Sequence, residues 1–153
     1  MKFRALRHIF FPWLAAMLLA LPARADELLM VRAERPFADA INDLQIAIQD
    51  HGYKVARIQR VDVGLASGGY ATAEYRLVFF GKPEEMREIE DRYPELLPYL
   101  PLKIVIFAEG NSALALAYNP AILQGFFKID PLQSRFQRWE KDIREILDQF
   151  AAQ

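Results

Sequence analysis

The chain of 153 residues contains no cysteine and only two histidines. Without cysteine it forms no disulfide, has no thiol nucleophile, and offers no thiolate to zinc or to an iron–sulfur cluster. His8 lies in the first 25 residues, which leaves His51 as the one histidine of the remaining chain. A typical zinc site needs three or four nitrogen, sulfur or oxygen ligands. We therefore expect no metal centre and no thiol chemistry.

Runs of basic residues are also missing from the chain. The first 25 residues hold four of the 19 lysines and arginines and none of the 20 aspartates and glutamates, so residues 26–153 carry a net charge of −5. A domain that binds nucleic acid usually presents a basic patch or stripe. The charge pattern therefore argues against nucleic acid as a partner.

No apolar run is long enough to span a membrane. Three basic residues open the chain, residues 9–21 are apolar apart from one proline, and Ala23-Arg24-Ala25 has the small-x-small form of a cleavage site. These are the three parts of a secretory signal, and a membrane span needs about 20 apolar residues. We expect residues 1–25 to be removed by cleavage after Ala25, and the mature chain to be periplasmic or secreted. Retention of the segment as a membrane anchor is the alternative.

Residues 26–130 predict one α+β domain. The stripe formed by Phe37, Ile41, Leu44 and Ile48, spaced four, three and four, predicts a helix after a first strand. The other predicted elements are strands over 53–63 and 73–80 joined by a flexible glycine-rich connection, a short helix over 84–90, and strands over 102–109 and 112–118. With a closing helix the order is β-α-β-β-α-β-β-α, which predicts a single sheet of about five strands with packed helices.

Residues 131–153 predict a C-terminal amphipathic helix. Ser134–Gln137 has the form of a capping box, and Trp139, Ile143 and Phe150 lie on one helical stripe behind it. We expect this helix to pack on the sheet. The alternatives are a partner or a membrane surface, and the mixed charge of its polar side weakens the membrane alternative.

The most apolar part of residues 26–153 is the predicted hairpin around Gly110-Asn111. Glycine at the first central position fits a two-residue type II′ turn. That turn pairs Ala108 with Ala113 on a shallow face and Phe107 with Leu114 on a bulky face. Because both faces are apolar, both need a cover. We expect helices on both faces, with a homodimer contact or an apolar ligand cavity as the alternatives.

No group of residues predicts a catalytic site. The serine at position 67 has no neighbouring histidine to activate it, and the acidic residues between 84 and 91 suit a solvated helix face. The candidates for binding a small apolar ligand or haem are His51, Met30, Phe107 and Tyr118. Each also has a structural explanation: His51 suits the negative end of a helix dipole, and Met30 suits a core position.

Several short motifs carry a family resemblance: His51-Gly52-Tyr53-Lys54-Val55, Val61-Asp62-Val63, Phe80-Gly81-Lys82-Pro83, Leu100-Pro101-Leu102-Lys103-Ile104-Val105 and Tyr118-Asn119-Pro120. Through them the chain from Met30 to Phe126 resembles domain-of-unknown-function family 302. The resemblance implies a small α+β domain with a compact sheet that associates as a dimer. It implies no activity and transfers no catalytic residue. The proline-rich segment 93–101 and the helix from Ser134 are expected to lie beyond the family's pattern.

Together these observations favour an exported, non-catalytic binding or interaction domain, with a homodimer as one form of that interaction. The alternative function is a carrier that holds a small apolar ligand or haem in a pocket beside the sheet. Enzymatic activity is the least supported hypothesis, because the sequence shows no activated nucleophile, no general base and no set of metal ligands.

Overall fold

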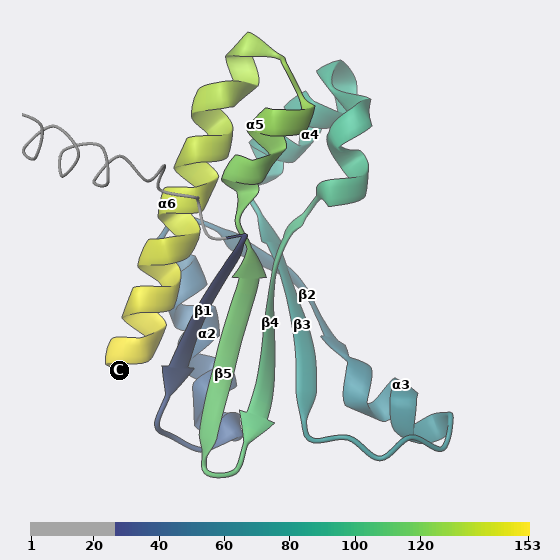
Figure 1. Cartoon of the computed structure of the whole chain (residues 1–153), viewed down its shortest axis with the longest axis vertical. Coiled ribbons are helices and arrows are strands. Elements are labelled where there is room, and N and C mark those ends of the chain that lie inside the picture. The colour runs from purple at the N-terminus through teal and green to yellow at the C-terminus, as the bar shows by residue number, and fades with distance from the viewer. Residues whose placement is uncertain (1–26) are drawn as a thin grey trace, which may run out of the picture.

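The structure, a computed structural model, describes residues 27–153 and shows one antiparallel sheet of five strands in the order β1-β5-β4-β3-β2 (Figure 1). The strands are β1 (Leu28–Ala33), β2 (Lys54–Arg60), β3 (Tyr75–Gly81), β4 (Leu102–Glu109) and β5 (Ser112–Tyr118). The predicted α+β class and the single five-stranded sheet are confirmed. The expected signal peptide lies outside the described residues.

Two long helices lie side by side on one face of this sheet, which we call the inner face. They are α2 (Phe37–Asp50) and α6 (Asp130–Ala152). The shorter helices are α3 (Val61–Ser67), α4 (Pro83–Arg92), α5 (Leu123–Phe126) and the 3-10 helices η1 (Pro94–Tyr99) and η2 (Pro120–Ile122).

Helix α2 follows its predicted stripe. Phe37, Leu44 and Ile48 are buried against the sheet. The helix ends at Asp50 with His51 as its C-cap, and Gly52 has a φ of +75°. That left-handed conformation favours glycine, so the sequence determines where the helix stops.

The β4–β5 hairpin has the predicted register. Glu109 pairs with Ser112, Ala108 with Ala113, and Phe107 with Leu114, and Gly110 has a φ of +62° in the turn. The alanine-rich side forms part of the inner face, where both long helices contact β5. Small side chains there let the helices approach the strand closely.

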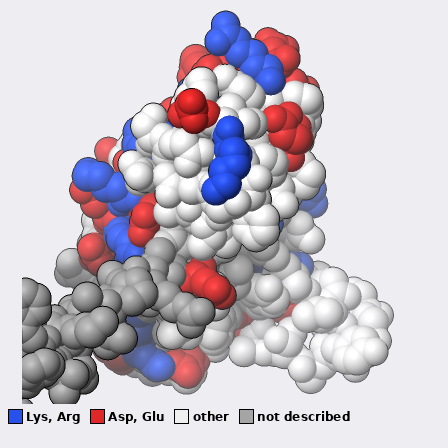
Figure 2. Space-filling model, turned by 45° about the horizontal axis from the view of Figure 1, so that its top comes forward, with Lys and Arg blue, Asp and Glu red and all other residues white. Residues whose placement is uncertain are grey.

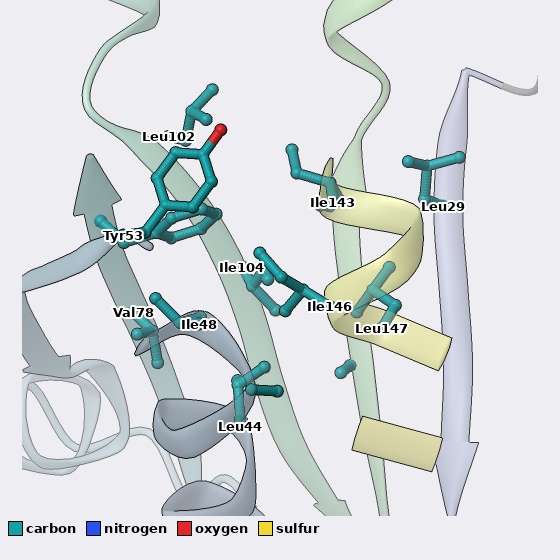
Figure 3. Packing of buried hydrophobic residues seen from close by; sticks show 14 of the residues in the cluster. Leu29, Leu44, Ile48, Tyr53, Val78, Leu102, Ile104, Ile143, Ile146 and Leu147 are labelled. Atoms are coloured by element: carbon teal, nitrogen blue, oxygen red, sulfur yellow. The ribbon is translucent and has the colours of Figure 1, made fainter. Parts of the chain in front are cut away.

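Helix α6 packs on the inner face but starts earlier than predicted. It begins at Asp130 with Pro131 in its first turn, and Ser134 lies inside the helix rather than capping it. Proline suits the first turn because it lacks a backbone N–H that would there have no helical partner. Figure 3 shows side chains of α6 meeting those of the sheet and of α2. The labelled residues include Ile143, Ile146 and Leu147 of α6, Leu29 and Ile104 of the sheet, and Leu44 and Ile48 of α2.

The predicted second strand over 53–63 is too long. The strand stops at Arg60, and Val61–Ser67 forms helix α3. The sequence predicts part of this segment as strand and the rest as a flexible connection. The Asp62 carboxylate pairs with Arg76 of β3, and this ion pair holds the chain in its new direction. Seven residues make only about two helical turns, and Val61, Val63 and Leu65 alternate as they would in a strand, so the sequence shows no helical period here.

The expectation of helices on both faces of the sheet is wrong for residues 27–153. Both long helices lie on the inner face, and no described helix covers the opposite face (Figure 1). We call that opposite face the outer face. The strand registers assign to it the side chains of Leu28, Met30, Arg32, Arg57, Gln59, Tyr75, Leu77, Phe79, Lys103, Val105, Phe107, Leu114, Leu116 and Tyr118.

The inner-face core predicts a strong dependence of stability on α6. Phe136 is fully buried, whereas Phe126 is 74% exposed. Phe136→Ala should lower the free energy of unfolding by about 3–5 kcal/mol, because it leaves a cavity in the core. Phe126→Ala should change it by less than about 0.5 kcal/mol. Denaturant unfolding at one protein concentration measures both, and equal effects would contradict this view of the core.

Candidate functional site

The outer face is apolar over its centre. Leu77 of β3, Val105 of β4 and Leu116 of β5 form one row across neighbouring strands and are only partly exposed. On the edge strand β1, Leu28 is exposed and Met30 is 62% exposed. Monomeric soluble proteins rarely expose a contiguous apolar patch of more than a few hundred Å². This face is therefore the leading candidate for a binding surface.

Charged side chains lie at the margins of the outer face. Arg57 and Lys103 flank Phe79 in one row of the register, and Arg32 forms an ion pair with Glu109 at the other end of the sheet. An apolar centre with a polar rim is the usual organisation of a protein interface.

A hollow of about 260 Å³ lies where the outer face meets the α3–β3 connection. Tyr75, Val105 and Phe107 line it from the sheet, and Thr72 and Ala73 line it from the connection. Its volume is close to the lower limit of small-molecule sites, roughly 300–1,000 Å³. Its lining is mainly apolar, so it suits an apolar group rather than a charged one.

Residues 61–74, which we call the arm, extend away from the sheet (Figure 1). Helix α3 buries none of its side chains, and its Val63 and Leu65 are exposed, as is Tyr70 at 69%. No charged residue occurs between Asp62 and Glu74. Figure 2 shows the arm as a white lobe at the lower right.

The root of the arm is fixed to the domain by Arg76. This side chain is 11% exposed and pairs with Asp62, and its guanidinium carbon lies 5.3 Å from the centre of the Phe37 ring. Desolvation opposes ionisation of Asp62, but the hydrogen bonds from Arg76 and from the Val63 backbone, with the charges of Arg76 and Arg60, lower the pKa of Asp62 below its ordinary value. The ion pair therefore forms at neutral pH.

A second polar group lies between α4, α6 and the start of β2. Tyr53 donates a hydrogen bond to Asp142 at 2.6 Å, and burial together with this bond raises the pKa of the Tyr53 hydroxyl. Arg138 donates to Asp142 at 3.1 Å and to Glu85 at 2.6 Å. Trp139 donates its indole N–H to Glu85 at 3.2 Å.

This polar group has a structural role. Its donors and acceptors satisfy one another and join α4 to α6, and none of these residues lines the hollow beside Phe107. The acidic residues between 84 and 91 are expected on a solvated helix face, and this role of Glu85 is not predicted from the sequence. The available signal was Trp139 on the buried stripe of α6, because a buried indole N–H requires an acceptor.

The structure brings three of the four candidate ligand residues to one face. Met30, Phe107 and Tyr118 all belong to the outer face. Tyr118 donates a hydrogen bond to the backbone oxygen of Tyr99 at 3.2 Å, and burial, with a contribution from Tyr99, raises the pKa of Tyr118 to about 12. Its hydroxyl is therefore neutral at physiological pH.

His51 does not join them, because it ends α2 on the inner side of the sheet. Its Nδ1 lies 2.9 Å from the backbone oxygen of Ala47. Within residues 27–153, no group of three or more histidine, aspartate or glutamate side chains is arranged to hold a metal ion. In the same part of the chain, none of the helices combines the length and apolar character that a membrane span requires.

These features define a small α+β domain with one sheet, helices on a single face and an open apolar face opposite. The chain belongs to the DUF302 family, a domain of unknown function, whose family model matches residues 29–150. The crystal structure of an uncharacterized conserved DUF302 protein from Bacillus stearothermophilus is similar to it, with a TM-score of 0.73 and 19% sequence identity, over 82% of this chain and 98% of that one. At this identity the likeness shows a shared fold. A comparison with curated proteins finds no match.

The family match corrects one expectation. The proline-rich segment and the closing helix do not lie beyond the family's pattern, because the match continues to residue 150. The physical reason is that α6 supplies fully buried side chains such as Phe136 and Trp139 to the core, so the domain needs the helix to fold.

The Asp62–Arg76 ion pair predicts pH-dependent order in the arm. Folding lowers the pKa of Asp62. The contribution of the ion pair to stability is therefore present above the ordinary carboxyl pKa and is lost as the pH falls through the lowered pKa. Asp62→Asn should therefore speed amide hydrogen exchange in α3 at pH 7, and the difference from the wild type should shrink on acidification.

Glu74→Gln is the matched control for this prediction. Glu74 also contacts Arg76, at 3.5 Å, but its side chain is 58% exposed, so solvent weakens the pair and the effect should be smaller. Equal exchange in the wild type and in Asp62→Asn at pH 7 would show that the ion pair does not hold the arm.

Proposed function

We propose that this protein is an exported, non-catalytic interaction domain that binds a second copy of itself through the outer face. The observation that carries the proposal is the apolar outer face, which no described helix covers. An apolar sheet face is ordinarily buried against a second layer. A second sheet of the same kind supplies such a layer.

Self-association suits the distribution of charge on this face. In a two-fold dimer the same patch occurs on both subunits, so the patch must be complementary to itself. The apolar centre meets that condition. The basic residues Arg57 and Lys103 lie toward one end of the strands and Glu109 toward the other, so they do not place like charges at the centre of the contact.

Export is supported by the first 25 residues alone. Their basic start, apolar run and Ala23-Arg24-Ala25 site form the pattern of a cleaved signal. The proposed mature protein therefore starts at Asp26 and works in the periplasm or outside the cell.

Phe107→Glu tests the proposed dimer. An unpaired carboxylate buried in the contact should cost several kcal/mol, which corresponds to a dissociation constant at least about 100-fold higher. Sedimentation equilibrium measures the constant, and circular dichroism checks the fold. Ile46→Glu is the control, because Ile46 is also apolar and exposed but lies on α2. A wild-type protein that stays monomeric at about 100 µM would overturn the proposal.

The hollow beside Phe107 favours a second candidate function, the transport of a small apolar ligand or haem. Its aromatic and aliphatic lining excludes water from one side of such a ligand. Met30 and Tyr118 lie on the same face as Phe107 but do not line the hollow. His51 is on the other side and takes no part.

Native mass spectrometry of the protein purified from its own host tests both export and the carrier function. Export predicts a chain mass that corresponds to residues 26–153. The carrier function predicts an additional bound mass that Phe107→Ala reduces, and a Soret absorption band if the ligand is haem. An apo mass without a Soret band would rule out the carrier, and a chain that retains residues 1–25 would rule out cleavage.

A further inference from the structure

We propose that the arm is a dimerisation clamp: in the homodimer, residues 61–74 of each copy pack on the outer face of the other. This inference rests on the proposed self-association and names a second contact surface for it. Four observations carry it, namely the unburied helix α3, the composition of the arm, its fixed root and its continuity with the outer face.

Apart from the Asp62–Arg76 ion pair at its start, helix α3 gains little from packing on its own domain. It has seven residues and buries none of them, and helices shorter than about 12 residues are marginal in water without tertiary packing. Its exposed Val63 and Leu65 are available for that packing. A partner that covers them supplies what the monomer lacks.

The composition of the arm suits an apolar contact. Solvated connections are usually polar, yet the arm between Asp62 and Glu74 carries no charge and exposes Tyr70. Tyrosine is enriched in interfaces because it offers a large contact area and a polar end. The centre of the outer face is apolar and matches this surface.

The root of the arm is rigid although the rest is exposed. Arg76 holds Asp62 on one side and lies over the Phe37 ring of α2 on the other. The arm is thereby held away from its own sheet and in reach of a neighbour. A pre-organised element loses less conformational entropy on binding than a free loop does.

The arm and the outer face form one continuous surface. Thr72 and Ala73 of the arm line the same hollow as Tyr75, Val105 and Phe107 of the sheet. Five strands spaced about 4.8 Å apart, with six to eight residues each, give a flat area of roughly 500 Å². The arm adds contact area to that of the sheet.

The absence of cysteine allows the clamp to be mapped by cross-linking. Leu65→Cys is mixed with one of three outer-face variants, Met30→Cys, Phe107→Cys or Leu114→Cys, and treated with a short bis-maleimide. The clamp predicts a cross-linked dimer of the two different chains for at least one pair. Leu65→Cys mixed with Ile46→Cys, on the far side of the domain, should give none. A Leu65 cysteine that links to no outer-face position would overturn the clamp.

A charge on the arm provides an independent measurement. Leu65→Asp should raise the dissociation constant of the dimer at least about 10-fold, and it should leave monomer unfolding unchanged because Leu65 is not part of the core. A dimer of unchanged affinity in Leu65→Asp would overturn the clamp and leave the proposed homodimer standing. A monomeric wild type would overturn both and assign the surface to another partner.

Discussion

The close packing of α2 and α6 on the alanine-lined inner face is the constraint on which the rest of the structure depends. Ala113 and Ala115 of β5 are fully buried, and Ala33 of β1 nearly so. Side chains this small let both helices lie near the backbone of the sheet, and Ile104 and Phe136 are fully buried in the same core. The domain thereby builds its whole core in one layer and has no described helix left for the other face.

The same register that builds the core also determines the outer face. Strand side chains alternate, so placing Ala108 and Ala113 inside places Phe107 and Leu114 outside. A slip of one residue would bury the bulky set against the helices and leave the alanines exposed. The apolar character of the outer face is therefore not a by-product of loose packing. Because the core fixes the register, the bulky apolar side chains of β4 and β5 face outward.

Local sequence signals predicted those elements that one or two residues specify. The turn at Gly110 and the helix end at Gly52 both rest on positive φ angles that glycine adopts readily, so the hairpin register and the extent of α2 followed from them. Helix α3 could not be predicted in this way, because its order depends on the distant Arg76. The outer face was predicted to be apolar, but its lack of a cover depends on where α6 packs, and no local pattern determines that.

Arg76 connects the core to the surface proposed for function. It lies on the inner side of β3, opposite Ile106, and its guanidinium group contacts the ring of Phe37 in α2. Through Asp62 it also sets the direction of the arm. A buried cation needs an anionic partner, and Asp62 is the less exposed of the two carboxylates that pair with Arg76, so burial of Arg76 favours a fixed position of Asp62 and of the first turn of α3. The orientation of the arm is thus a consequence of how the core is built, which gives a clamp of this kind a fixed geometry before any partner arrives.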